Sequence, residues 1–389
     1  MICKRIKILE DSLVFKTSNN FYDFIVEESG NIYKSLEVIC MGLIYSNGFI
    51  GIKVDINDNE VYFHLQNYLF PAKCNINEYE WNVKAFNYNL TQNLSGYEMV
   101  CKKGEYGERI KKYFVEKKNI FFNESNGTTI IVDNKNVKIY NSDKKGLFID
   151  TYRTVRQLLI NDLLQRGGIV VHSSSVYMGA KGYLFVGNKG AGKTTSLFQY
   201  LNSSRSDVLY GSNERTILVP KDNNILMYGW PGTAFVGVGS IYSTIGLRKL
   251  INVHRKTGGT AYWLSMHQVV ENDYVDRLIM MGEQAKNVKE KIWLTSSEIA
   301  NLTNRKICNY GYLDKIIWPK LALEQLQCVY KTNRSINGEV IQDLTFFGDW
   351  MEEYRKPKKS NDEIWRKLRK VPQYEISGND LYFNFDNSV

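Results

Sequence analysis

The residues with the clearest chemical meaning form a glycine-rich loop that ends in a lysine and two threonines. Residues 187–194 match the pattern G-x-x-x-x-G-K-[ST] in full, and Thr195 follows directly. In such a loop the backbone N–H groups surround phosphate oxygens, the lysine reaches the β- and γ-phosphates, and the hydroxyl binds Mg²⁺. We therefore expect Lys193 to neutralise the phosphates of a nucleoside triphosphate and Thr194 to hold the metal ion. The residues expected to bind the nucleotide are Gly187, Asn188, Lys189, Gly190, Ala191, Gly192, Lys193, Thr194 and Thr195.

The loop lies in the local context that this chemistry requires. Residues 183–186 are apolar and predict a β-strand, and residues 196–201 have the apolar spacing of a helix. The N-terminus of that helix adds partial positive charge beside the phosphates. Strand, loop and helix together predict a nucleoside triphosphate site rather than a chance glycine-rich turn.

Three segments around the loop resemble the catalytic domain of HPr kinase/phosphorylase and its relatives. These relatives are bacterial serine-kinase-like proteins that include peptide-tailoring kinases. The segments are VHSSSV at residues 171–176, YGSNERTIL at residues 210–218 and GWPG at residues 229–232. In that family a histidine-bearing strand comes just before the phosphate loop, and the strand after the loop helix carries the catalytic carboxylate. The resemblance covers roughly residues 150–330 and implies an ATP- and Mg²⁺-dependent kinase.

The resemblance assigns roles to individual residues. Glu214 is expected to align the acceptor hydroxyl and take its proton, and Asn213 is expected to contact the metal ion together with Thr194. His172 is expected to orient the acceptor or touch the γ-phosphate, and Arg215 to clamp charge in the transition state. Each also has a structural interpretation: Glu214 and Arg215 as a solvated ion pair, and His172 as an ordinary strand residue.

The sequence departs from that family at two points. The family's usual second acid after the loop helix is an aspartate, whereas Asn213 and Glu214 stand here. A glutamate is one methylene longer, but its carboxylate can still reach a substrate hydroxyl. The glutamate–arginine–glycine signature associated with phosphorylase activity is absent, so HPr is not the expected substrate.

The leading interpretation is a kinase that transfers the γ-phosphoryl group of ATP to a hydroxyl, most plausibly a serine of a peptide or small protein. Two alternatives stay open. One is a nucleotide-binding regulatory or structural protein that transfers no phosphoryl group. The other is a lyase similar to phosphoenolpyruvate carboxykinase, which needs a Lys/His/Asp metal set that we do not find. The chain lacks the signatures of ABC-type ATPases, motor ATPases and GTPases.

Composition limits the expected partners and location. With 50 Lys and Arg against 41 Asp and Glu, the net charge is +9, which suits an acidic partner such as a nucleotide. No basic segment is interleaved with aromatic residues, so nucleic acid is a disfavoured partner. The six cysteines form no C-x-x-C pair. The first residues lack the apolar core of a signal peptide. No apolar run reaches the ~18 residues that are needed to span a membrane. We expect a cytoplasmic protein with no membrane partner, and a homo-oligomer is one of the states left open.

The predicted fold class is α/β. The expected domains are a β-rich N-terminal domain over residues 1–149, a P-loop domain of the HPr kinase type over 150–330, and a mixed basic C-terminal extension over 331–389. The expected elements are a helix at 151–165, a strand at 169–176, a strand pair at 208–210 and 216–219, strands at 21–26, 48–54, 61–65 and 128–132, and Asn-Gly turns at 47–48 and 126–127.

Overall fold

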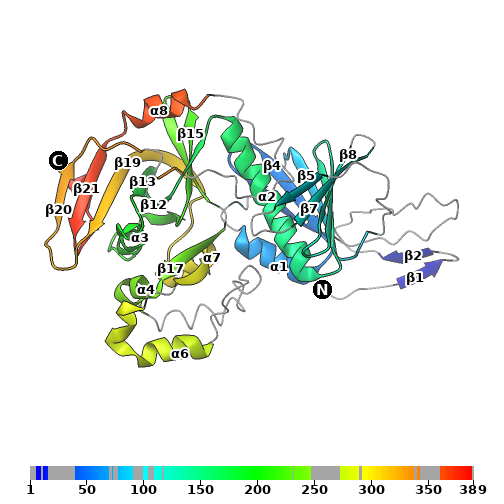
Figure 1. Cartoon of the computed structure of the whole chain (residues 1–389), viewed down its shortest axis with the longest axis horizontal. Coiled ribbons are helices and arrows are strands. Elements are labelled where there is room, and N and C mark those ends of the chain that lie inside the picture. The colour runs from blue at the N-terminus through cyan, green and yellow to red at the C-terminus, as the bar shows by residue number, and fades with distance from the viewer. Residues whose placement is uncertain are drawn as a thin grey trace.

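The structure is a computed structural model of a mixed α/β protein with two large sheets (Figure 1). The predicted strand at residues 21–26 lies outside the residues that it describes. Those are residues 6–9, 12–15, 40–69, 72, 78–90, 100–103, 109–115, 118–230, 232–246, 272–288, 291–336, 340–341 and 360–387.

The first sheet has eight strands in the order β3-β4-β5-β10-β9-β8-β7-β6. Strand β5 is parallel to both of its neighbours, and the other pairs are antiparallel. A separate hairpin joins β1 (Ile6–Leu9) to β2 (Ser12–Phe15). The strands of the sheet are β3 (Met41–Ser46), β4 (Gly51–Ile56), β5 (Trp81–Phe86), β6 (Val100–Lys103), β7 (Arg109–Val115), β8 (Lys118–Asn123), β9 (Thr128–Asp133) and β10 (Asn136–Tyr140).

Both Asn-Gly turns predicted in this half are confirmed. Gly48 connects β3 to β4 with a φ of 86°, and Gly127 connects β8 to β9 with a φ of 75°. Both angles lie in the left-handed region, which glycine enters without the steric penalty of a Cβ. The Asn47 side chain accepts hydrogen bonds from the backbone of Phe49 and Ile50, so the first turn is closed by its own sequence.

The prediction of a strand at residues 61–65 is wrong, because these residues belong to helix α1 (Asn59–Tyr68). Asp58 caps the helix by accepting hydrogen bonds from the backbone N–H groups of Glu60 and Val61, each 3.0 Å long. Val61, Leu65 and Tyr68 are fully buried at helical spacing against the sheet. The β-branched and aromatic residue types favoured a strand, but the cap and the 3.6-residue period of the buried face decide the conformation.

Replacing Asp58 with alanine is expected to lower the free energy of unfolding by about 1 kcal/mol, because two N–H groups of the first turn lose their acceptor. Asp58 also lies 3.2 Å from the Lys144 ammonium, so Asp58→Asn is the matched control: it keeps the cap and removes the charge. Urea unfolding of the three proteins measures the difference. The cap would not stabilise the helix if the alanine and asparagine variants were equally stable.

The second sheet has nine strands, seven of them in the order β11-β15-β16-β19-β13-β12-β14. The long β19 also pairs with β21, which in turn pairs with β20. Only the pairs of β19 with β13 and β21 are parallel. The strands are β11 (Ile169–Val171), β12 (Ser173–Met178), β13 (Lys181–Val186), β14 (Val208–Ser212), β15 (Thr216–Lys221), β16 (Asn224–Gly229), β19 (Tyr310–Leu321), β20 (Cys328–Lys331) and β21 (Gln373–Gly378).

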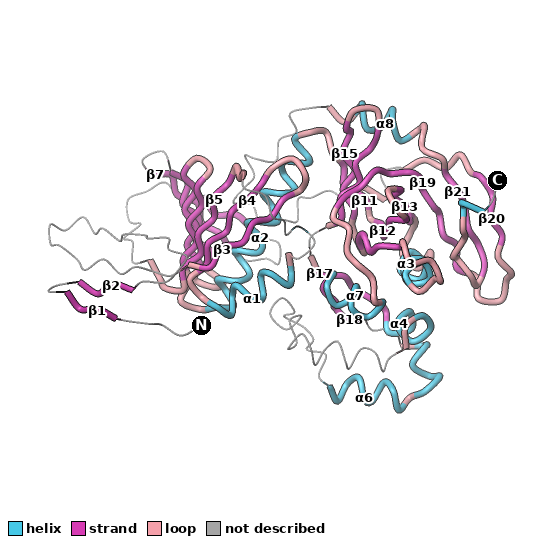
Figure 2. The backbone as a smooth tube through the Cα atoms, turned by 180° about the vertical axis from the view of Figure 1, so that it is seen from behind, coloured by secondary structure: helices cyan, strands magenta, loops and turns pink. Residues whose placement is uncertain are grey.

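Helices cover both faces of this sheet. Tyr183 and Phe185 of β13 pack with the helices α3, α4 and α7, whereas the alternate residues Leu184 and Val186 face the core that α8 completes. Figure 2 shows α8 well apart from α3. The two-stranded antiparallel sheet of β17 and β18 lies near α4 and α7 (Figure 2). These elements, with α6 and two 3₁₀ turns, are α3 (Lys193–Leu201), β17 (Thr233–Gly237), α4 (Val238–Thr244), α6 (Asn272–Met280), η3 (Gly282–Asn287), β18 (Lys291–Thr295), α7 (Ser296–Thr303), α8 (Asp362–Leu368) and η5 (Phe385–Asn387).

Helix α2 (Lys144–Gln165) connects the two halves of the molecule (Figure 1). The predicted helix at 151–165 is confirmed, although it begins seven residues earlier. Its first half contributes Leu147 and Val155 to the core of the first sheet, and its end contributes Leu163 to a core with β15 and β16. The expected boundary at residue 149 therefore falls inside one continuous helix.

Two other expectations differ from the structure. The strands expected at 208–210 and 216–219 exist as β14 and β15, but β14 pairs with β12, and β15 pairs with β11 and β16. Residues 331–389, expected as an extension, supply β21 to the same sheet as the glycine-rich loop. Both differences involve pairing between distant segments, which local residue patterns do not encode.

Candidate functional site

The glycine loop (residues 187–194) connects β13 to α3, as the sequence predicts. Gly190 and Gly192 have φ angles of 87° and 105°, and Gly192 is the N-cap of α3. A Cβ at Gly192 would lie 2.8 Å from the Leu381 side chain, and the positive φ would strain any residue other than glycine. The loop therefore presents its backbone at the start of a helix, where N–H groups and the helix dipole favour an anion.

Lys193 is anchored in this loop. Its Nζ donates hydrogen bonds to the carbonyl oxygens of Gly187, at 2.7 Å, and Asn188, at 3.1 Å. The side chain is buried, and burial lowers the pKa of its ammonium, with a further lowering by the charge of Lys291 and a raising by that of Glu214. The ammonium is thus held in place inside the loop.

A cavity of about 540 Å³ opens beside the loop. Its lining contains three lysines, Lys189, Lys193 and Lys291, and one carboxylate, that of Glu214. The lining therefore has an excess of positive charge. The structure brings most of the predicted residues together here, whereas Gly187, Asn188, Ala191 and Arg215 are not part of the lining. The full lining is His172, Lys189, Gly190, Gly192, Lys193, Thr194, Thr195, Asn213, Glu214, Phe235, Gly237, Ser240, Lys291 and Leu321.

Asn213 and Thr194 lie next to each other, as expected of a shared metal site. Asn213 stands in the turn between β14 and β15, and its Oδ1 accepts hydrogen bonds from Ser174, at 2.6 Å, and Thr194, at 3.3 Å. An amide oxygen and a hydroxyl are ligands that suit Mg²⁺, which usually keeps several waters and phosphate oxygens in addition. In the part of the chain that the structure describes, no three His, Cys, Asp or Glu side chains come together as metal ligands. The Thr194 hydroxyl and the Asn213 amide oxygen suit a Mg²⁺ ion that also binds phosphate oxygens.

Glu214 has a backbone conformation that is rare for its residue type. Its φ is 80°, in the left-handed region, which costs a residue with a Cβ on the order of 1 kcal/mol or more. Its carbonyl oxygen accepts hydrogen bonds from His172 Nδ1, at 2.9 Å, and from the Ser173 backbone, at 3.2 Å. These bonds hold the turn in a strained shape that directs Glu214 to the cavity.

The environment makes the Glu214 carboxylate a stronger base. Burial raises its pKa, while the charges of Lys291, Lys193 and Arg215 and a hydrogen bond with the Phe235 backbone lower it, and burial has the larger effect. A carboxylate with a raised pKa accepts a proton more readily near neutral pH.

His172 interrupts the strand that the sequence predicts at 169–176. The chain bends there, so β11 ends at Val171 and β12 starts at Ser173. Because the Glu214 carbonyl can only accept, His172 Nδ1 carries the proton, and Nε2 of the neutral ring is an acceptor. Burial, followed by the charge of Lys193, lowers the pKa of His172 to about 4, so the ring is neutral at pH 7.

Replacing His172 with asparagine is expected to weaken the pH dependence of stability between pH 6.5 and 4. The pKa of His172 is about 4 in the folded chain and about 6.5 in an unfolded one, so the unfolded chain binds the proton first. The contribution of the neutral ring to stability is complete above pH 6.5 and is lost as the pH falls towards 4. After solvent screening of the half-buried ring, the wild type should lose on the order of 1–2 kcal/mol more than the variant. Urea unfolding across this range tests the difference, and equal losses in both proteins would contradict it.

Arg215 lies beside Trp230 and is not part of the cavity lining. Its guanidinium stacks on the ring of Trp230 at 5.0 Å, and Arg156 lies 5.6 Å from the same ring. Arg215 is not among the residues that line the cavity, although its charge lowers the pKa of both His172 and Glu214. Arg215 thus influences the site through its charge.

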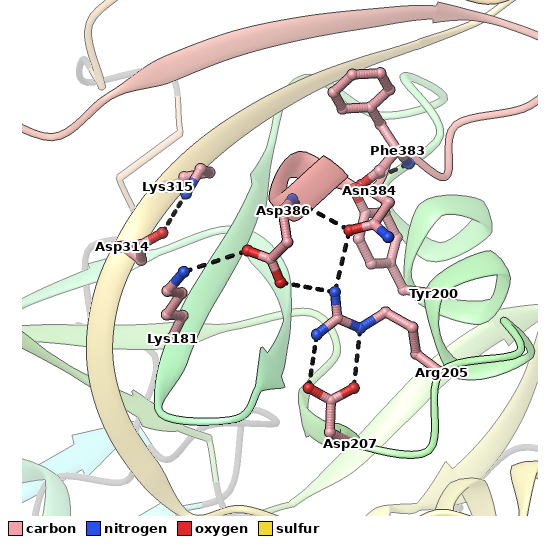
Figure 3. A network of polar contacts seen from close by, with 9 residues as sticks. All are labelled: Lys181, Tyr200, Arg205, Asp207, Asp314, Lys315, Phe383, Asn384 and Asp386. Atoms are coloured by element: carbon pink, nitrogen blue, oxygen red, sulfur yellow. Dashed lines mark hydrogen bonds and ion pairs between the residues drawn. The ribbon is translucent and has the colours of Figure 1, made fainter. Parts of the chain in front are cut away.

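The C-terminal segment is joined to Tyr200 of α3 and to Arg205 by polar contacts (Figure 3). Arg205 pairs with Asp207 through two contacts of 2.7 and 2.9 Å and donates to Asp386 at 2.7 Å. Tyr200 of α3 donates a hydrogen bond to the backbone of Phe383 at 2.9 Å (Figure 3). These contacts keep the segment that carries Leu381 against Gly192.

Sequence reasoning missed five residues of the cavity lining, which are Phe235, Gly237, Ser240, Lys291 and Leu321. Lys291 and Phe235 reach the site because β17 and β18 pair, with Gly237 opposite Lys291. No spacing pattern in the sequence connects either residue to the loop.

Neither the comparison with models of protein families nor that with curated proteins found a match for this chain. No helix of the described residues has both the length and the apolar character needed to cross a membrane. The function is therefore inferred from the cavity and the residues that line it.

Proposed function

We propose that the protein is an ATP- and Mg²⁺-dependent kinase whose residues 150–330 form a catalytic domain of the HPr kinase type. The observation that carries this proposal is the meeting of Lys193, Thr194 and the strained Glu214 in one cavity. A chance glycine-rich turn does not account for a carboxylate held at a positive φ beside a buried lysine.

The cavity suits a nucleoside triphosphate in charge and size. Its volume of about 540 Å³ lies in the range of small-molecule sites, and its three lysines oppose the charge of the phosphates. The loop amides and Lys193 bind the phosphate chain. Thr194 and Asn213 are the residues that would hold Mg²⁺, which neutralises charge between the β- and γ-phosphates when bound.

Glu214 performs the proton transfer in this proposal. Its carboxylate accepts a hydrogen bond from the acceptor hydroxyl and takes the proton as the oxygen attacks phosphorus. The new O–P bond forms, the bond between the γ-phosphorus and the bridging oxygen breaks, and ADP leaves. The neutral His172 presents its Nε2 as a second acceptor that orients the hydroxyl.

The acceptor class is proposed as a serine of a peptide or small protein. The support is the resemblance to serine-kinase-like and peptide-tailoring proteins over residues 150–330. A second candidate, a nucleotide-binding protein without transfer, is favoured by Asn213, since an amide replaces the second acid of the family at the expected metal site.

Incubation of the full chain with Mg²⁺ and γ-labelled ATP tests the proposal, first alone and then with serine-containing peptides and a phosphatase-treated cell extract. Label recovered as phosphoserine supports the kinase. If the protein binds ATP tightly but transfers no labelled phosphoryl group to a peptide, a protein or water, the kinase proposal is overturned. The nucleotide is then a ligand.

A further inference from the structure

We propose that Lys291 distinguishes a triphosphate from a diphosphate by contacting the γ-phosphoryl group. This inference rests on the proposed function, because it concerns the nucleotide of the same cavity. It adds a specificity-determining residue outside the glycine loop, about a hundred residues further along the chain.

The antiparallel pairing of β17 with β18 carries Lys291 to the cavity. Lys291 is the first residue of β18 and pairs with Gly237 of β17, and both line the cavity. Phe235, two residues before Gly237, also lines it and hydrogen-bonds through its backbone to Glu214. Lys291 is thus fixed by its backbone to the same wall that touches the Glu214 carboxylate.

The ammonium of Lys291 is available to a ligand. Lys291 is exposed, and its Nζ lies 6.0 Å from the centroid of the Phe235 ring. None of the ion pairs among the described residues includes it. Its positive charge acts on Lys193, Glu214 and His172 together, which places it near all three. Two ammonium groups in one cavity repel each other, and a bound polyphosphate would relieve that repulsion.

The γ-phosphoryl group is the part of the ligand that best fits this position. The glycine loop and Lys193 hold the phosphate chain of the nucleotide from one side. The γ-phosphoryl group must face Glu214, because the acceptor hydroxyl attacks from there. Lys291 shares a wall with Glu214, so its ammonium meets the terminal phosphate rather than the α-phosphate. A lysine serves here as a flexible point charge.

Calorimetric titration of the full chain with MgATP and with MgADP tests the inference. Lys291→Ala is expected to weaken MgATP binding by about tenfold or more, in line with one lost charged contact, and MgADP binding by less than about threefold. Lys291→Arg should keep most of the preference. Lys286→Ala is the control, because Lys286 is an exposed lysine outside the cavity lining.

The outcomes separate this inference from the proposed function. Equal weakening of both nucleotides by Lys291→Ala, or no weakening, would overturn the inference even if the wild type still labels its acceptor. If the wild type binds neither nucleotide, the proposed function fails and the inference fails with it. Circular dichroism of each variant confirms that the fold is intact.

Discussion

Replacement of Glu214 with glutamine is expected to lower the rate of phosphoryl transfer by about 10²–10⁴-fold. The amide has nearly the same size and can still accept a hydrogen bond, but it cannot take the proton of the acceptor hydroxyl. The hydrogen bonds from the His172 side chain and the Ser173 backbone N–H go to the Glu214 carbonyl oxygen, so they survive the change. MgATP affinity should therefore stay within about threefold of the wild type. Single-turnover transfer of label and calorimetric binding measure the two quantities separately.

A matched control for this variant is Glu283→Gln, which removes the same charge from an exposed residue of η3. Its transfer rate should equal that of the wild type. The role of Glu214 as base would be refuted by a transfer rate within twofold of the wild type. A loss fully explained by weaker ATP binding would instead make Glu214 a binding residue.

Replacement of Lys193 with alanine is expected to weaken MgATP binding by about 10- to 100-fold and to remove detectable transfer. A hydrogen bond to a charged group contributes about 1.5–3 kcal/mol, and the buried ammonium makes its contacts from inside the loop. The same side chain neutralises the transferred group, so the rate falls further than the affinity. Calorimetry gives the affinity, and labelled ATP at saturating concentration gives the rate.

Lys189→Ala provides the comparison, because Lys189 belongs to the same loop and lines the same cavity but is exposed. Its loss should weaken MgATP binding by less than about fivefold. A larger effect of Lys189→Ala than of Lys193→Ala would show that the loop binds its ligand in a different way. Thermal unfolding of both variants checks that the protein still folds without the hydrogen bonds from Lys193 to the loop carbonyls.

The parts of the site that the sequence predicts are those formed by short segments. The glycine loop, the strand before it and the helix after it lie within about 20 residues, and their conformations follow from local steric preferences and hydrogen bonds. The Asn-Gly turns at 47–48 and 126–127 are predictable for the same reason. In α1 the residue types favoured a strand, whereas the N-cap and the helical spacing of the buried residues favoured a helix. The segment is a helix, so the residue types alone gave the wrong prediction.

The sequence by itself determined the loop, its lysine and the approximate place of the catalytic candidates. Only the tertiary structure decided that β17 and β18 bring Lys291 to the cavity, that Arg215 stacks on Trp230 instead, and that the C-terminal segment packs on Gly192. These arrangements depend on contacts between residues far apart in the chain. Their energies come from shared burial and strand pairing, which no local pattern of residue types specifies.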